Sequence, residues 1–147
     1  MSDLDTLYRE LIIDHSKHPQ HFGLADEDGA HATSHQKNPV CGDEITLRAR
    51  VETDGETIRD VTWEGSGCSI SQASASMLSD LVEGMSRTEA TTLIDGFREA
   101  LRSRGQIELD EDVYGDAAAL TGVSKFSARV KCAMLAWVAL EDALARA

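Results

Sequence analysis

The sequence predicts an α+β fold, in which helices cover one face of a small antiparallel sheet of about three strands. Three observations carry this prediction. Residues 44–52 alternate between apolar and polar side chains, a turn and a second strand pattern follow, and from Ile70 onward the apolar residues recur at helical spacing. A chain of 147 residues is close to the common size of a domain, so we expect one domain over residues 1–147.

The first predicted element is a short amphipathic helix that ends before Pro19. Its apolar residues recur at helical spacing and are Leu4, Leu7, Tyr8, Leu11 and Ile12. Residues 20–39 are polar, contain Gly23 and Gly29, and show no periodic apolar face. We therefore expect a long loop between the first helix and the sheet.

An antiparallel hairpin is predicted over residues 44–65. The apolar side of its first strand consists of Ile45, Leu47, Ala49 and Val51. Residues 53–56 (Thr-Asp-Gly-Glu) form a turn signal, and Ile58, Val61 and Trp63 indicate the returning strand. The hairpin supplies two strands of the sheet.

Three further helices are predicted after the hairpin. The first runs from Ile70 to near Gly84, and the second begins with the capping-box sequence of residues 86–89 and ends near Ser103. Residues 105–122 are acidic and mixed, which favours a loop with a short helical piece. The last helix is expected over residues 128–145.

Composition excludes several classes of partner. The chain has 14 basic and 26 acidic residues and a net charge of −12, which disfavours binding to nucleic acid or to anionic membranes. Its longest uncharged apolar run, residues 132–140, is far shorter than the roughly 20 residues needed to cross a bilayer. The acidic N-terminus does not resemble a signal peptide, so we expect a cytosolic protein.

Three cysteines, Cys41, Cys68 and Cys132, have neighbours that favour a thiolate. Cys41 lies between Pro39 and Gly42 before the first hairpin strand. Cys68 follows a glycine turn at the start of a helix, where backbone N–H groups attract negative charge. Cys132 follows two cations and, like the others, does not lie in the middle of an apolar stripe of the sequence. An odd number of cysteines in the cytosol argues against a disulfide framework.

A carboxylate completes a candidate metal site. Asp43 lies two residues after Cys41, so in an extended segment both side chains point to the same side. With Cys68 and Cys132 they would form the four-coordinate set that zinc takes, although spacings of 27 and 64 residues match no zinc-finger pattern. Arg129 and Lys131 are candidates to offset part of the site's negative charge.

Three blocks of this sequence resemble the SufU branch of the IscU-like iron–sulfur assembly proteins. They are Asn38-Pro39-x-Cys41-Gly42-Asp43, Gly67-Cys68-x-Ile70-Ser71-x-Ala73-Ser74, and Arg129-x-Lys131-Cys132-Ala133-x-Leu135-x-Trp137. Tyr8 and the stretch Asp14-His15-x-Lys17-x-Pro19 agree as well. IscU has a histidine before its third cysteine, where this chain has Lys131, and together with the added segment 105–122 this difference points to the SufU branch.

The resemblance implies an IscU-like fold and a function. It implies Zn²⁺ bound by Cys41, Asp43, Cys68 and Cys132, with Cys41 as the residue that accepts sulfur. It also implies a SufS-type cysteine desulfurase as sulfur donor and a SUF scaffold complex as downstream acceptor. The chain would then be a zinc-dependent sulfurtransferase that relays persulfide sulfur into iron–sulfur cluster assembly.

Several alternatives stay open at this point. The chain can be a scaffold on which a transient iron–sulfur cluster forms, because thiolates bind such clusters readily. The zinc site can be purely structural, and Asp43 can be an ordinary turn residue. Cys68 with an N-terminal histidine can act as a cysteine hydrolase. The five histidines, His15, His18, His21, His31 and His35, are interpreted as structural or surface residues rather than as a second metal site.

Overall fold

The computed structural model describes residues 3–39 and 42–147. Its sheet has three antiparallel strands in the order β1-β2-β3. The strands are β1 (Ala30–Lys37), β2 (Glu44–Val51) and β3 (Ile58–Ser66). In the β2–β3 turn the Asp54 carboxylate accepts the N–H groups of Glu56 and Thr57, both at 2.8 Å. The predicted hairpin and the predicted fold class are confirmed.

The prediction of a loop over residues 20–39 is wrong for the second half of this segment, because β1 lies there. The inward positions of this strand are the small residues Ala32 and Ser34, which pair with Ala49 and Leu47 of β2. Small and polar residues give no alternation of large apolar side chains, so the usual pattern of a strand is missing. Backbone pairing with β2 makes this segment a strand.

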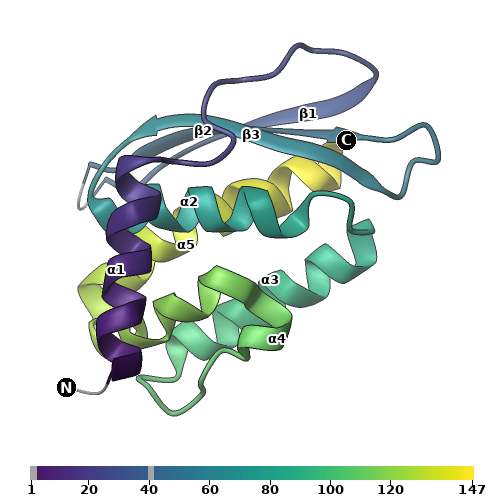
Figure 1. Cartoon of the computed structure of the whole chain (residues 1–147). Helices are drawn as coiled ribbons and strands as arrows, with labels where there is room; N and C mark the ends of the chain where they lie inside the picture. Colours follow the sequence, from purple (N-terminus) through teal and green to yellow (C-terminus); the bar gives the residue numbers. More distant parts are fainter. Residues whose placement is uncertain (1–2, 40–41) are drawn as a thin grey trace.

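The first half of that segment is a loop, and it crosses the outer face of the sheet (Figure 1). Arg48, on the outer face of β2, donates to the carbonyl oxygen of Ala25 at 2.6 Å. At the edge of β3, the Trp63 N–H donates to the carbonyl of His21, and the Trp63 carbonyl accepts from Gly23. The loop therefore covers the sheet face that the helices leave open.

Helices cover the other face of the sheet in two layers (Figure 1). Two helices, α2 (Ser69–Val82) and α5 (Ser127–Arg146), pack directly against the strands. Farther from the sheet lie α1 (Asp3–Lys17) and α3 (Arg87–Arg102). Large aromatic residues fill the core, where the rings of Phe97 and Trp137 stack with centroids 3.7 Å apart.

The helix boundaries agree closely with the predicted ones. The Ser86 hydroxyl caps α3 by accepting the N–H of Glu89 at 3.1 Å, as the capping-box sequence predicts. Residues 105–122 are more helical than expected, since they include α4 (Glu111–Tyr114) and most of the 3-10 helix η1 (Gly115–Lys125). None of the helices that the structure describes is long and apolar enough to span a membrane.

A buried hydroxyl joins the two helices beneath the sheet. Ser74 of α2 donates to the carbonyl oxygen of Ala133 at 2.6 Å and accepts the indole N–H of Trp137 at 2.9 Å. Ala133 directly follows Cys132, and Ser74 is one and a half turns along α2 from Cys68. This contact therefore sets how closely the two cysteine-bearing helix ends approach one another.

Candidate metal centre

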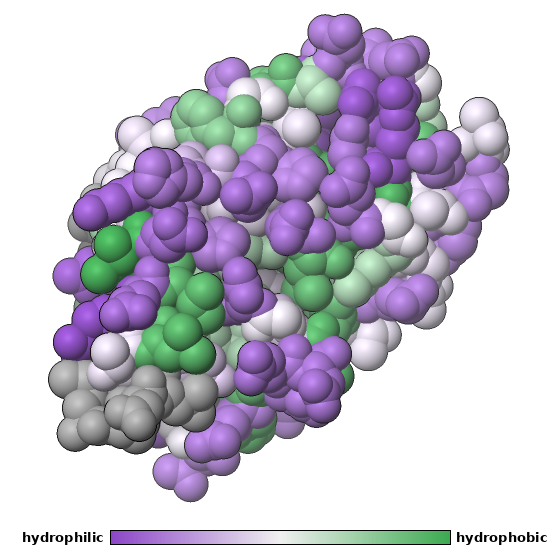
Figure 2. All heavy atoms as spheres, in the orientation of Figure 1, coloured by the Kyte–Doolittle hydropathy of each residue, from purple (hydrophilic) through white to green (hydrophobic). Residues whose placement is uncertain are grey.

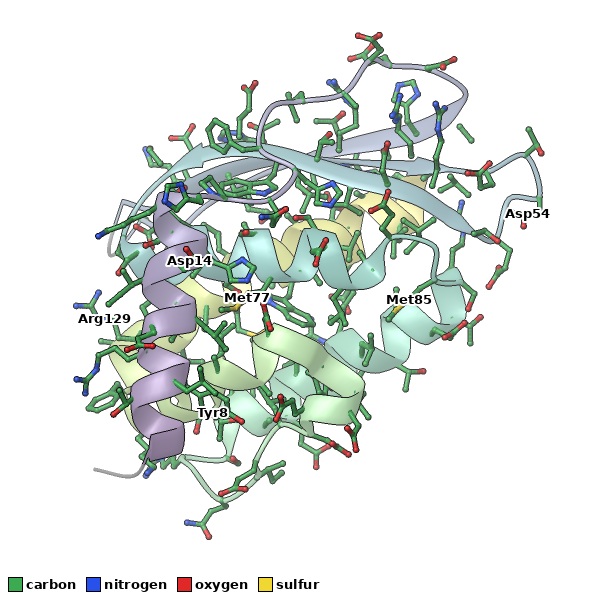
Figure 3. The ribbon with its side chains drawn as sticks, viewed as in Figure 1. Tyr8, Asp14, Asp54, Met77, Met85 and Arg129 are labelled. Atoms are coloured by element: carbon green, nitrogen blue, oxygen red, sulfur yellow. The ribbon has the colours of Figure 1, made fainter. Side chains whose placement is uncertain are left out.

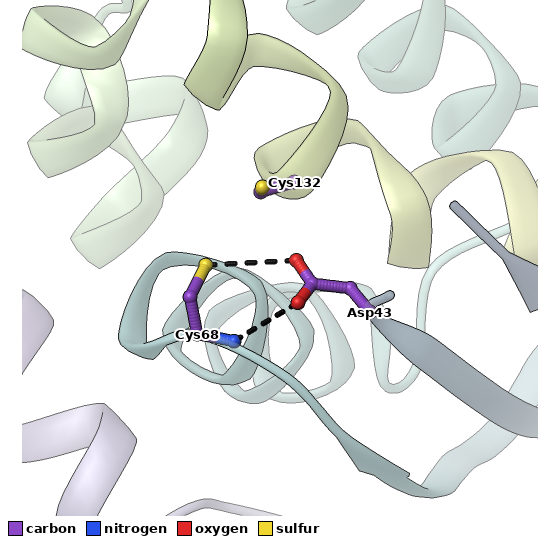
Figure 4. Close-up of side chains that lie close together, drawn as sticks. All are labelled: Asp43, Cys68 and Cys132. Carbon is purple, nitrogen blue, oxygen red and sulfur yellow. Dashed lines mark hydrogen bonds between the residues drawn. The ribbon is translucent and has the colours of Figure 1, made fainter. Parts of the chain in front are cut away.

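Asp43, Cys68 and Cys132 meet at one end of the sheet (Figure 4). Asp43 lies just before β2, Cys68 just before α2, and Cys132 in the second turn of α5. One ligand atom from each residue lies within 4.8 Å of the other two. Among the residues that the structure describes, no other set of three or more His, Cys, Asp or Glu side chains forms such a group.

Cys68 is held at the N-terminus of α2, where it is the N-cap residue. Its backbone N–H donates to one carboxylate oxygen of Asp43 at 3.1 Å, and its thiol donates to the other oxygen at 3.5 Å (Figure 4). The hydroxyl of Ser71 lies 4.0 Å from the same sulfur. A carboxylate at this position is favoured by the partial positive charge of the helix N-terminus.

The Asp43 side chain is buried, with 3% of the residue exposed. Its backbone carbonyl accepts the N–H of Asn38 at 2.8 Å, and the N–H of Gly42 donates to the Asn38 carbonyl at 2.8 Å. Gly42 has a φ of 75°, a backbone conformation that glycine adopts without strain. Buried carboxylates in proteins are paired, hydrogen-bonded or bound to a cation, so the position of Asp43 suits a metal ligand better than a surface turn residue.

Gly67 follows the end of β3 and lies close to the Asp43 carboxylate. A Cβ atom at this position would stand 2.5 Å from an Asp43 carboxylate oxygen and 2.6 Å from the Ser71 hydroxyl. Both atoms are the ends of side chains, and both would have to shift to admit a Cβ atom at this position. The glycine before Cys68 therefore allows Asp43 and Cys68 to approach each other.

Cys132 lies on the buried side of α5, with 2% of the residue exposed. The expectation that no cysteine belongs to an apolar stripe is wrong here, because Cys132 lies among the buried residues Ala133 and Ala136. Its sulfur lies 3.9 Å from the carbonyl oxygen of Ala128, one turn earlier. The preceding residue, Lys131, lies on another side of the helix, and Arg129, three residues before Cys132, is exposed in the first turn of α5.

The three side chains fit a thiophilic divalent ion. Two cysteine sulfurs and one carboxylate oxygen are donor types that zinc takes, and two thiolates on one tetrahedral zinc lie about 3.8 Å apart. The three ligand atoms lie within 4.8 Å of one another, which exceeds that sulfur–sulfur distance by about 1 Å. Rotation of the side chains can close this difference. Three ligands leave one position of a tetrahedral site for a fourth donor. The predicted fourth donor, Cys41, lies outside the described residues.

Arg129 and Lys131 are exposed and do not contact the site. Neither side chain makes a hydrogen bond or an ion pair with any residue that the structure describes. Any effect of the two cations on the charge of the site therefore acts at a distance. Their closeness to Cys132 in the sequence therefore did not predict a contact with the metal site.

The described histidines are not part of this group. His15 is buried, with Ser76 at 2.7 Å from its Nδ1 and Asp116 at 2.9 Å from its Nε2. This chain of contacts joins α1 to α2 and to η1, and no spacing in the sequence predicts it. The Cys68 sulfur contacts Asp43 and Ser71 but none of the described histidines, so the cysteine hydrolase hypothesis lacks its base.

Comparison with known proteins agrees with this geometry. The family described as NifU-like N terminal domain matches residues 7–145. The zinc-dependent sulfurtransferase SufU of Bacillus subtilis is 40% identical over 146 residues, which cover 99% of this chain and 94% of the relative. The iron–sulfur cluster assembly scaffold protein IscU of Streptococcus pyogenes is 43% identical over 146 residues, with 99% and 87% covered.

A solved structure shows the same fold. It is described as an iron–sulfur cluster assembly scaffold protein for the SUF system, from Fervidobacterium islandicum AW-1. It superposes with a TM-score of 0.82 at 35% identity, covering 95% of this chain and 97% of the other. By its sequence over nearly the whole length, its three-stranded fold and its Asp43–Cys68–Cys132 group, this chain belongs to the family of NifU-like N-terminal domains, with IscU and SufU among its relatives.

Proposed function

We propose that the chain is a cytosolic zinc-dependent sulfurtransferase, which accepts persulfide sulfur from a SufS-type cysteine desulfurase and relays it to a SUF scaffold complex. The observation that carries the proposal is the convergence of Asp43, Cys68 and Cys132 from three separate elements. The similarity to a relative named as a zinc-dependent sulfurtransferase supports it. The whole chain, residues 1–147, would act as one domain.

In this proposal Zn²⁺ is held by Asp43, Cys68, Cys132 and Cys41. Cys41 is two residues before Asp43 in the chain, and two residues of extended backbone span at most about 7 Å, so its side chain is within reach of the group. A bound Zn²⁺ would keep its cysteine ligands deprotonated without redox chemistry of its own.

Cys41 is the proposed sulfur acceptor because each of the other two cysteines is held within the fold. Cys132 is buried, and Cys68 is fixed by the start of α2 and by its bonds to Asp43. Cys41 instead lies between Pro39 and Gly42, which are both exposed. An acceptor thiolate has to approach a sulfur atom on another protein, which favours a position in a loop.

The transfer step leaves the total oxidation state unchanged. The Cys41 thiolate attacks the terminal sulfur of the donor's cysteine persulfide, and a new S–S bond forms as the donor's S–S bond breaks. The electron pair of the broken bond leaves on the donor cysteine as a thiolate. Cys41 becomes the persulfide, and no separate oxidant or reductant is consumed.

A mass measurement tests the proposal. The chain is incubated with desulfurase and cysteine, and its peptides are weighed; we expect a gain of one sulfur, about 32 Da, on the peptide that contains Cys41. Cys41→Ala should keep the fold and lose this adduct, whereas Cys68→Ala should lose zinc. The proposal fails if no adduct forms on Cys41, or if the two variants behave alike.

The second candidate is a scaffold that assembles an iron–sulfur cluster and transfers it. Several relatives are named as iron–sulfur cluster assembly scaffold proteins, and one of them is 43% identical to this chain. The same thiolates would bind the cluster. Anaerobic reconstitution with iron and sulfide distinguishes the two functions: a stable brown cluster on the native fold favours the scaffold, and retention of zinc favours the sulfurtransferase.

A further inference from the structure

An open groove lies beside the metal centre, between α1 and the end of η1. Its volume is about 600 Å³, within the roughly 300–1,000 Å³ of clefts that take ligands. We call it the α1 groove. The residues that matter to its chemistry are Arg9, Ile13, Ile70, Lys125, Phe126 and Arg129.

The groove adjoins both helix ends that carry the cysteines. Ser69 and Ile70, which line it, directly follow Cys68, and Arg129 comes from the first turn of α5, three residues before Cys132. Tyr8 of α1 and Arg129 appear on the same side of the molecule in Figure 3. A ligand seated in the groove is therefore placed next to the metal centre.

The charge of the groove is opposite to that of the chain. Arg9, Lys125 and Arg129 line it, and none of its lining residues among the described side chains is acidic, although the whole chain has 26 acidic and 14 basic residues. Lys125 and Arg129 make no ion pair with any described residue. A second groove, which Asp95, Glu99, Arg98 and Arg102 help to line, has the mixed charge that the composition predicts.

Apolar side chains stand exposed in the same groove. Phe126 is 64% exposed and Ile13 is 43% exposed, and both line it. Figure 2 shows apolar surface interrupting the hydrophilic surface along α1, at the left of the view. An exposed apolar patch with a charged rim is typical of a surface that binds another protein.

We propose that the α1 groove docks a segment of the sulfur-donating protein in which an apolar side chain lies between carboxylates. The apolar side chain packs against Ile13 and Phe126, and the carboxylates pair with Lys125 and Arg129. Bound there, the donor's persulfide is held close to the metal centre. This inference rests on the proposed function, because that function supplies the donor.

Binding of the desulfurase tests the charge of the groove. The zinc-loaded chain is titrated onto the desulfurase without cysteine, so that the affinity is measured without turnover. We expect Lys125→Glu to weaken binding about tenfold, and Arg102→Glu, the same change at the second groove, to alter it less than about twofold. The loss in Lys125→Glu should shrink with rising salt, because screening weakens the native attraction.

The apolar contact at Ile13 is tested with a control variant at an isoleucine of similar exposure. Ile13 is 43% exposed and Ile107, in the second groove, is 40% exposed. We expect Ile13→Ser to weaken binding at least about fivefold, and Ile107→Ser to leave it within about twofold. The inference is overturned if the α1-groove variants bind like the native chain, or if the second-groove variants lose as much affinity.

Two readouts separate this inference from the proposed function. Zinc content and sulfur uptake from inorganic polysulfide need no protein donor, so both should be native in Lys125→Glu and Ile13→Ser. A variant that also loses zinc or polysulfide uptake has a damaged metal centre, which overturns the docking role of that residue. If the native chain takes up no sulfur from either donor, the proposed function fails, and the docking inference is still decided by the affinities.

Discussion

The Cys68 sulfur lies 3.5 Å from a carboxylate oxygen of Asp43, although the two residues are 25 positions apart in the chain. The same carboxylate accepts the Cys68 backbone N–H through its other oxygen. Two ligands of the proposed zinc site are therefore brought into contact by the meeting of β2 with the β3–α2 junction. Metal binding displaces the thiol proton, so zinc uptake should release protons and weaken as the pH falls.

Gly67→Ala should lower zinc affinity by about 10- to 100-fold. The new methyl group would stand 2.5 Å from the Asp43 carboxylate, which would have to move away from Cys68. A competition titration against a zinc-binding dye measures the change. Gly122→Ala is the matched control, because a Cβ atom at Gly122 meets nothing within 4 Å. Native zinc affinity in Gly67→Ala would contradict the close approach.

Ser74→Ala should destabilise the fold by about 1–3 kcal/mol, because the buried indole N–H of Trp137 loses its acceptor. Urea unfolding of the zinc-loaded protein measures this change. Ser79→Ala serves as control: the Ser79 hydroxyl is also buried in α2 but only donates, to the Ser76 and Gln20 carbonyls. Equal losses in the two variants would show that the link between α2 and α5 has no special role.

Removal of the metal should lower the melting temperature. Zinc present at 1,000 times its dissociation constant stabilises a protein by about 4 kcal/mol, which corresponds to a shift of about 10 °C for a chain of this size. Calorimetry with and without chelator measures the shift. The variant Cys68→Ala, which lacks a ligand, should melt at nearly the same temperature in both conditions. A native chain that is indifferent to chelator would contradict the zinc site.

Asp60 should make stability fall in acid. The hydrogen bonds from the Arg50 guanidinium, at 2.8 and 2.5 Å, hold the Asp60 pKa below its ordinary value. A lowered folded-state pKa contributes stability above the unfolded value of about 3.9, and that contribution is lost as the pH falls through the folded pKa.

Asp60→Asn should therefore cost about 1–2 kcal/mol at neutral pH, and the difference from the native protein should shrink below about pH 4. Denaturant unfolding at several pH values checks this. Asp142→Asn removes an exposed carboxylate paired with Arg146 in α5, and should have a smaller effect because solvent screens the pair. A pH-independent difference for Asp60→Asn would show that packing, not charge, is lost.

Local sequence signals predicted most of the secondary structure. The Ser86 capping box, the turn at residues 53–56 and Pro19 each act within a few residues, so they can be interpreted without knowledge of the rest of the chain. Strand β1 was missed because its inward residues are small and its pairing with β2 is a long-range contact. The helical content of residues 111–125 was underestimated for a similar reason, since buried alanines there gain their burial from neighbouring helices.

The sequence by itself determined the kinds of donor: three cysteines, one aspartate after a glycine, and glycines where a strand turns into a helix. Only the tertiary structure decided that Asp43, Cys68 and Cys132 converge. It also decided that Arg129 and Lys131 remain outside that group and that a basic groove opens beside it. The physical reason is the distance along the chain over which each kind of interaction acts. Turn and capping preferences act between neighbours in the chain, whereas a metal centre or a groove depends on how sheet and helices pack, and that packing is set by burial of the whole core.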